Sequence, residues 1–117
     1  MSKTTAALLV KLAMTLSITA ITLGAIDKVP GAWQLVIAVL GTAVNYLLGD
    51  LVILPVSDNL MASVTDGLMA ALLAYLVDLL VPAFTASFMV LVAFTMLIAF
   101  GEYFFHQYLL KSEKVAP

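Results

Sequence analysis

Four long apolar stretches, separated by short polar or proline-containing breaks, dominate the pattern of the chain. They cover residues 6–26, 32–54, 59–80 and 83–110, and the breaks contain Asp27–Gly31, Pro55–Asp58 and Val81–Pro82. Each stretch is at least as long as the ~20 residues that a helix needs to cross a bilayer. None alternates strictly between apolar and polar residues, as the strands of a membrane barrel do. The pattern therefore predicts an all-α integral membrane protein.

The short breaks also predict how these helices pack. Helices joined by a few residues lie antiparallel beside each other. We therefore expect a single membrane domain over residues 1–117, a four-transmembrane-helix bundle made of two antiparallel helical hairpins, followed by a short polar C-terminal tail. The fourth stretch has 28 residues and exceeds one bilayer core, so it must tilt or project into the headgroup region.

The composition agrees with this class and excludes others. Hydrophobic residues make up 64% of the chain and charged residues only 10%, whereas soluble domains are about half apolar and about a quarter charged. Five basic residues are too few for a nucleic-acid binder. There is no cysteine, phosphate-binding loop, nucleophile elbow or zinc-protease motif. We therefore expect no enzyme activity, no catalytic residues and no cofactor.

The lysines predict the orientation in the membrane. With four crossings, both termini lie on the same side, and Lys3, Lys11, Lys111 and Lys114 lie on or near that side. Lys28 alone lies on the other. Because cytoplasmic loops carry the excess of lysine and arginine, both termini are expected in the cytoplasm.

Antiparallel helices bring most polar residues of the apolar stretches to one depth, the cytoplasmic third of the membrane. Asp27 and Asp78, at the other end, are expected to be solvated helix ends. The candidate intramembrane cluster consists of Lys11, Asn45, Asp50, Asn59, Asp66, Glu102 and His106.

Helical spacing indicates that several of these groups face inward together. Lys11 shares one side of its helix with Thr15 and Thr22, and Glu102 is four residues before His106. The third helix has a polar stripe of Asn59, Ser63, Asp66 and Ala70. The second offers Gly41, Asn45 and Gly49, with Asp50 offset from this face by more than a quarter turn. We expect Asp66 to be the main partner of Lys11, with Glu102 and Asp50 competing.

Three carboxylates against one lysine leave an excess of negative charge. Either His106 is protonated, or a carboxyl group is protonated, or a cation binds. The last two would indicate transport, whereas a buried ion pair that only determines helix packing would indicate a structural role. No metal site is expected from His106, Glu102 and Asp66, because the chain has one histidine.

A row of small residues on the first helix predicts a close helix–helix contact. It lies opposite Lys11 and contains Ala13, Ser17, Ala20 and Gly24. The contact is expected within the bundle or between two copies of the chain.

Two stretches resemble a known family. The run NYLLGDLVILP at residues 45–55, followed by Asn59, Ala62, Asp66 and Gly67, resembles the signature of the YndM-like proteins. The run GEYFFHQYL at residues 101–109 is similar to the closing motif of that family. These are small four-helix membrane proteins of Gram-positive bacteria. The resemblance implies four spanning helices and a bacterial plasma membrane, and it brings no established activity.

Three functions remain open. The first is a small proton- or cation-linked transporter, possible as a homodimer because four short helices scarcely enclose a substrate path. The second is a structural or accessory membrane protein whose buried charges orient its helices. The third is a protein that handles lipid or polyprenyl groups at the cytoplasmic leaflet. Membrane lipid is the expected surrounding in each case.

Overall fold

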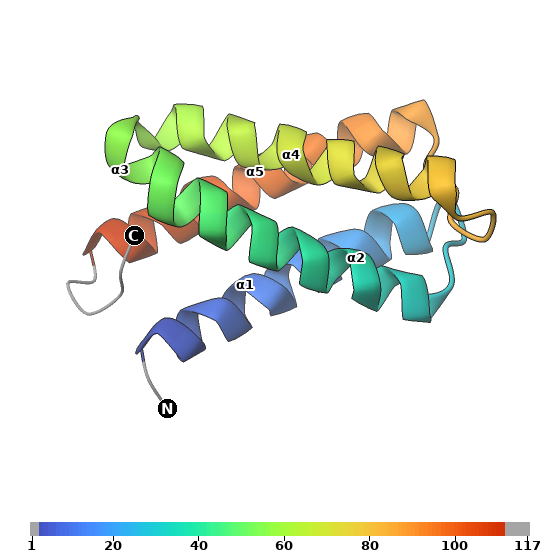
Figure 1. Cartoon of the computed structure of the whole chain (residues 1–117), viewed down its shortest axis with the longest axis horizontal. Coiled ribbons are helices and arrows are strands. Elements are labelled where there is room, and N and C mark those ends of the chain that lie inside the picture. Colours follow the sequence, from blue (N-terminus) through green and yellow to red (C-terminus); the bar gives the residue numbers. More distant parts are fainter. Residues whose placement is uncertain (1–2, 112–117) are drawn as a thin grey trace.

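The structure, a computed structural model, describes the backbone of residues 3–111 and the side chains of residues 4–107. Its elements are α1 (Lys3–Thr19), η1 (Ala20–Gly24), α2 (Gly31–Val44), η2 (Asn45–Ile53), α3 (Leu54–Val56), α4 (Asn59–Leu80) and α5 (Phe88–Lys111). The η segments are π-helical turns that continue the preceding helices (Figure 1). The predicted polar tail with Lys114, and the side chains of Lys3 and Lys111, lie outside the described residues.

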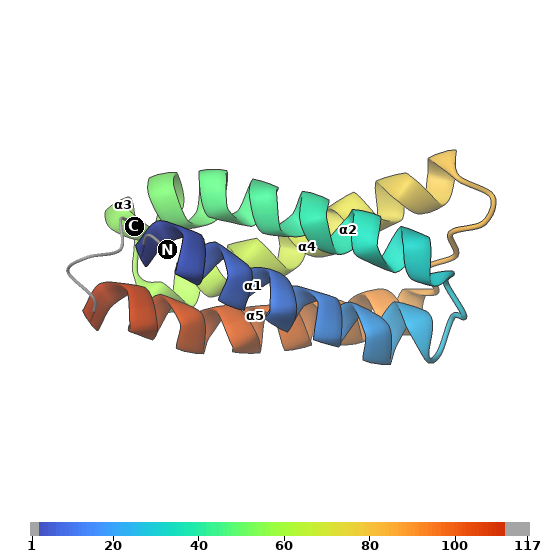
Figure 2. The ribbon, with the colours of Figure 1, turned by 90° about the horizontal axis from the view of Figure 1, so that it is seen from below.

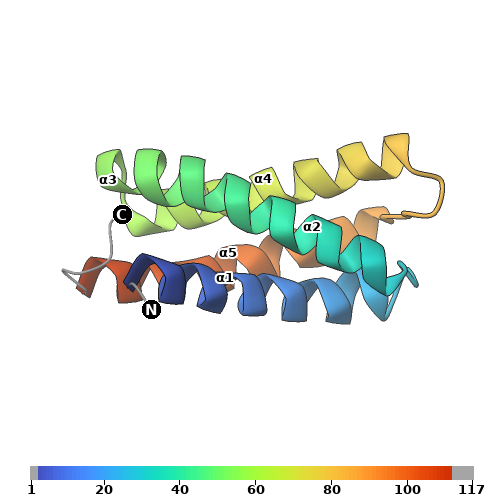
Figure 3. The ribbon, with the colours of Figure 1, turned by 60° about the horizontal axis from the view of Figure 1, so that its bottom comes forward.

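The helices form an antiparallel bundle (Figures 1 and 2). In Figure 3, α1 and α5 make one layer and α2 and α4 the other. Helix α1 packs on α2 and α5, whereas α4 packs chiefly on α5 and η2. Residues 3 and 111 lie at the same end as α3, and the connections at 25–30 and 81–87 lie at the opposite end (Figure 1). The predicted all-α fold is thereby confirmed.

The outer surface of the bundle is that of a multi-pass membrane protein. Within the described residues, four helical segments are long and apolar enough to cross a bilayer. They are Thr4–Gly24, Gly31–Val56, Asn59–Leu80 and Phe88–Gln107. Large apolar side chains such as Leu47, Leu68 and Phe100 are more than half exposed around the bundle. In lipid this exposure carries no penalty, because the solvent is itself apolar.

The fourth helix begins at Phe88, not at residue 83 as the apolar run predicted. Residues 81–87 instead form a connection that follows Leu80. Ser87 directly precedes the helix, and its Oγ accepts the Val90 N–H at 3.4 Å. Serine in this position satisfies a backbone donor that the first helical turn leaves free. A capping serine therefore decides the boundary, which hydropathy alone does not reveal.

Two carboxylates hold this connection in place. Asp27 Oδ2 accepts the Ser87 N–H at 2.7 Å, and Asp78 Oδ2 accepts the Ala86 N–H at 3.3 Å. The expectation that Asp27 and Asp78 are merely solvated helix ends was wrong. Asp27 joins the two connections at this end, and Asp78 ties the 81–87 connection to α4. Both place negative charge near the start of α5, where the helix dipole favours it.

The row of small residues on the first helix lies mostly on the outside. Ala13, Ser17 and Ala20 are exposed, so of the two expected contacts the one within the bundle is wrong for them, and the one between copies stays a prediction. Only the end of the row packs internally: a Cβ on Gly24 would overlap the Gln34 side chain. The row faces outward because Lys11 and Thr15, on the opposite face of the same helix, are buried in the bundle.

Two apolar clusters fill the interior and leave a polar layer between them. The larger lies toward the 25–30 and 81–87 connections and includes Leu23, Ile37, Phe94 and Ile98. The smaller lies toward α3 and contains Ala7, Leu54, Ala62 and Phe105. By their positions along the helices, the buried charged side chains fall between these clusters.

Candidate functional site

The π-helical segment η2 turns Asp50 into the bundle. In an α-helix, Asn45 and Asp50 would lie about 140° apart around the axis, which is why the spacing left the direction of Asp50 uncertain. A π-helix pairs residues five apart, so both can occupy one face. Both side chains are buried here, at 1% and 0% exposure. The wider turn therefore adds a carboxylate to the interior.

Lys11 bridges two of the three carboxylates. Its Nζ donates to Asp50 Oδ2 at 3.0 Å and to Glu102 Oε2 at 2.5 Å, and all three side chains are fully buried. It also lies 4.9 Å from the centre of the Phe105 ring, within the range of a cation–π contact. Lys11 thus links α1 to η2 and α5.

The expectation that Lys11 pairs mainly with Asp66 was wrong. Helix α1 packs on α2 and α5, whereas Asp66 belongs to α4, which packs chiefly on α5 and η2. Once η2 has turned Asp50 inward, it reaches Lys11 from the neighbouring helix.

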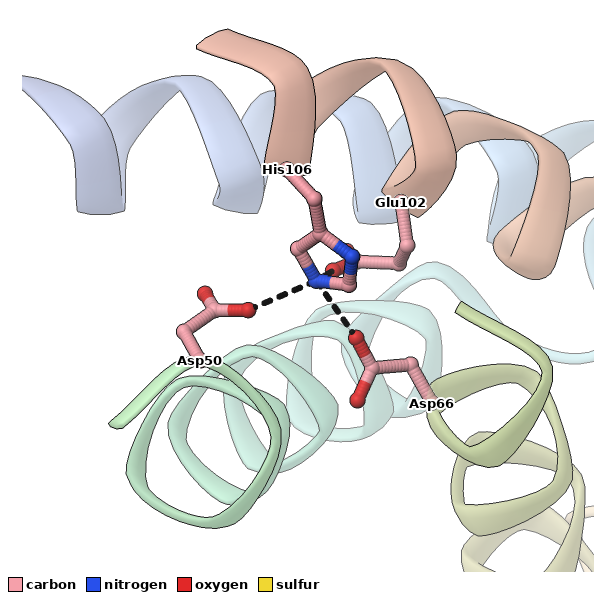
Figure 4. A group of neighbouring side chains, drawn as sticks. All are labelled: Asp50, Asp66, Glu102 and His106. Carbon is pink, nitrogen blue, oxygen red and sulfur yellow. Dashed lines mark hydrogen bonds and ion pairs between the residues drawn. The ribbon is translucent and has the colours of Figure 1, made fainter. Parts of the chain in front are cut away.

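His106 gathers all three carboxylates around one ring nitrogen (Figure 4). Its Nε2 lies 2.8 Å from Asp50 Oδ1, 3.0 Å from Asp66 Oδ2 and 3.4 Å from Glu102 Oε2. The three acids come from η2, α4 and α5. The imidazole is therefore the group on which three helical segments converge.

The other ring nitrogen has a different environment, which determines its role. Nδ1 lies 2.9 Å from Asn59 Oδ1, whose own Nδ2 donates to the Tyr103 carbonyl at 3.0 Å. That second bond identifies the oxygen of the amide, and an oxygen can only accept. The hydrogen bond to Asn59 therefore places a proton on Nδ1. Ser63 Oγ lies 3.1 Å from His106 Nδ1 and donates to Asn59 Oδ1 at 3.1 Å, so the same amide oxygen accepts from both side chains.

Asp66 has the least satisfied carboxylate of the cluster. It is fully buried, and neither of its oxygens makes a hydrogen bond within the described part of the chain. Oδ2 faces His106 Nε2, whose hydrogen bond goes to Asp50 Oδ1 instead. Glu102 Oε1 likewise lacks a hydrogen-bond partner among the described residues. Buried oxygens without donors are costly, so these atoms are the natural place for a bound ion, proton or water.

Gly49 makes the position of Asp66 sterically allowed. A Cβ at Gly49 would overlap the Asp66 carboxylate. The glycine therefore brings the backbone of η2 against the acid on α4, and a larger residue at this position would require the Asp66 carboxylate to move.

Six of the seven predicted cluster residues meet in one group of hydrogen bonds and ion pairs: Lys11, Asp50, Asn59, Asp66, Glu102 and His106. The seventh, Asn45, is buried without a hydrogen bond to the described residues. The prediction omitted Phe105 and underrated Ser63, although Ser63 lies on the stripe between Asn59 and Asp66. The packing of a ring against a lysine of another helix left no signal in the spacing.

The comparisons with known proteins give the chain a family and no activity. A family model described as "Protein of unknown function (DUF2512)" matches residues 2–115, so the chain belongs to this family. No curated protein and no solved structure matches it.

Proposed function

We propose that this member of an uncharacterised family is a small proton- or cation-linked transporter of a bacterial plasma membrane. The observation that carries the proposal is the buried cluster, in which three carboxylates face one lysine and one imidazole. Ionisable groups within a spanning segment are expensive, and they commonly mark ion pathways and proton relays.

The charge balance explains why a mobile positive charge fits this site. Among the described side chains, Lys11 offsets one of the three negative charges, and a protonated His106 would offset a second. One negative charge then remains in a fully buried layer. A proton or another small cation on Asp66, which accepts no hydrogen bond in the described structure, would complete the neutralisation. Release of that cation would expose the imbalance again, as a carrier requires.

The proposed orientation places the cluster near the cytoplasm. Lysine lies predominantly at the end where the chain begins and ends, and this bias supports cytoplasmic termini. Asn59 is only half-buried at this end and contacts His106, so it gives the cluster a polar connection toward the cytoplasmic surface.

Single cysteines test this orientation, since the natural chain contains none. Val56 and Leu80 are suited to the test because their exposure is 83% and 81% and they lie at opposite ends of the bundle. A membrane-impermeant maleimide added to intact cells is expected to label Leu80→Cys. It should label Val56→Cys only after the membrane is opened. The reverse pattern would place the cluster at the outer leaflet.

A homodimer would supply the transport path that one copy lacks. The exposed face of α1 with Ala13, Ser17 and Ala20 suits the close approach of a second α1, since small side chains let helix backbones meet. This surface faces away from the cluster, so two copies would keep separate ion sites.

Flux through proteoliposomes tests the transport function. The purified chain is expected to accelerate the decay of a proton or cation gradient, and Asp66→Asn should reduce this rate at least tenfold by removing the charge that binds the ion. Asp58→Asn is the matched control: Asp58 caps the same helix by accepting the Met61 N–H at 2.6 Å, and asparagine caps equally well. In the same assay, Ala20→Leu should lower both flux and dimer content.

A flux equal to that of empty vesicles would contradict transport. So would equal rates for Asp66→Asn and the unmodified chain.

A structural role is the second candidate, favoured by the bridging position of Lys11. Its two ion pairs join three helical segments and would by themselves orient the bundle. On this alternative, Asp66→Asn changes stability and leaves the gradient decay at the level of empty vesicles. The flux assay therefore separates the two functions.

A further inference from the structure

We propose that Asp50, Asp66, Glu102 and His106 bind a divalent transition-metal ion. The inference deepens the proposed function by naming its cation, and it rests on that function only for the statement that the ion is carried. It replaces the expectation from sequence that a single histidine leaves no metal site.

The ligand atoms lie close enough together for one ion. One nitrogen or oxygen from each of the four residues lies within 4.8 Å of the others. A tetrahedral ion with bonds of about 2.1 Å holds its ligand atoms about 3.4 Å apart. His106 Nε2 lies 2.8 Å from Asp50 Oδ1, 3.0 Å from Asp66 Oδ2 and 3.4 Å from Glu102 Oε2, the oxygen that also contacts Lys11. Binding one ion would require the ligand atoms to adjust from these distances to about 3.4 Å.

The imidazole is already oriented as a metal ligand. Its Nδ1 proton is donated to Asn59 Oδ1, which directs Nε2 toward the carboxylates (Figure 4). Ligating histidines usually donate their second N–H to an oxygen in this way, which fixes both ring orientation and tautomer. When a metal binds, its ion takes the place of the Nε2 proton, and that proton leaves to solvent.

An independent observation is that some carboxylate oxygens of the cluster receive no hydrogen bond from the described residues. Lys11 engages Asp50 Oδ2 and Glu102 Oε2, which leaves Asp50 Oδ1 facing His106 Nε2 at 2.8 Å and Glu102 Oε1 without a hydrogen bond among the described residues. Glu102 Oε1 and both oxygens of Asp66 accept no hydrogen bond in the described structure, and both residues are fully buried. Asp66 Oδ2 points into the group (Figure 4). A metal would satisfy the carboxylate oxygens that lack a hydrogen bond, and it would replace the contact of Asp66 Oδ2 with His106 Nε2, now 3.0 Å away.

The charge of the site selects a divalent ion. With the lysine charged and the imidazole neutral, three carboxylates leave two negative charges among the described side chains of the cluster. A divalent cation cancels both, whereas a monovalent ion leaves a net charge inside the membrane.

The donor set selects the class of metal. One imidazole with three carboxylates suits Zn²⁺, Mn²⁺ or Fe²⁺, because Ca²⁺ and Mg²⁺ prefer oxygen ligands alone. Thiolate-seeking Cu⁺ is disfavoured, since the chain has no cysteine.

Binding is tested on the full chain in detergent, with any affinity tag removed. Titration calorimetry with Zn²⁺ alone and paramagnetic resonance with Mn²⁺ alone are expected to show one saturable ion per chain. Asp66→Asn and His106→Gln should each weaken binding at least tenfold, and Asp58→Asn should leave it unchanged. Asn59→Ala retains all four ligands and should weaken binding by about 10–100-fold, as loss of a supporting hydrogen bond does.

One measurement uses the unmodified chain, so its result does not depend on whether a variant folds. The chain contains a single histidine, so nitrogen coupling of the imidazole type in the spin-echo spectrum of bound Mn²⁺ would assign His106 directly. Absence of stoichiometric binding by both ions would overturn the site, as would bound Mn²⁺ without nitrogen coupling. Proton flux without metal binding would overturn the metal site and leave transport standing. Stoichiometric metal binding with no flux of any cation would overturn transport and leave the metal site standing.

Discussion

Replacing Lys11 with methionine is expected to lower the free energy of unfolding by about 3–5 kcal/mol. Methionine has a similar length but no charge, so Asp50 and Glu102 would stay fully buried without the ammonium that lies 3.0 and 2.5 Å from them. Removing one member of a buried ion pair costs more than the pair contributes, because the remaining charge is left uncompensated. Unfolding of the purified chain by SDS or heat measures the loss.

Double-mutant cycles identify the partner of Lys11. The pair Lys11→Met and Glu102→Gln should cost less than the sum of the single changes, with a coupling of about 0.5–3 kcal/mol, because the second change removes the charge that the first leaves unmatched. Coupling to Asp66→Asn should be smaller, since Asp66 meets His106 rather than Lys11. Asp78→Asn, at the opposite end, is the distant control and should be additive. A stronger coupling to Asp66 than to Glu102 would contradict the observed pairing.

The depth of the charged layer could be predicted from the sequence, because helices of known rise that alternate in direction assign each residue a level. For that reason Lys11, Asp66 and Glu102 were expected together, and they do converge. The pairs within the layer could not be predicted. They depend on which helices are neighbours and which are diagonal, and hydropathy carries no information about that choice.

Asp50 illustrates a second limit. The prediction assumed 3.6 residues per turn throughout, and Asp50 then falls beside the inward face. The π-helical turns of η2 alter the period for nine residues and bring the carboxylate inside. Such insertions often accompany functional sites, since they sacrifice regular hydrogen bonding to redirect a side chain. The start of α5 was missed for a related reason, because a capping hydrogen bond and not hydropathy determines it.

Gly49 links this irregular segment to the site, and Gly49→Ala is expected to disrupt the cluster by adding a single methyl group. A Cβ there would overlap Asp66, which is fully buried between α4 and η2. Overpacking of this kind costs about 1–3 kcal/mol. The displaced carboxylate would also move relative to His106 Nε2, now 3.0 Å from Asp66 Oδ2, so metal affinity should fall together with stability.

Gly41→Ala separates this steric effect from the general preference of helices for alanine over glycine. A Cβ at Gly41 would meet Thr15 Cγ2 at 3.8 Å, an ordinary contact, so this control should be neutral or stabilising by up to about 1 kcal/mol. Shortening the acid should relieve the clash: once Asp66→Ala is present, Gly49→Ala should cost much less in thermal or SDS unfolding. If Gly49→Ala is as harmless as Gly41→Ala in the unmodified chain, then Asp66 does not lie against η2, and neither the ion site nor its unsatisfied oxygens are arranged as described.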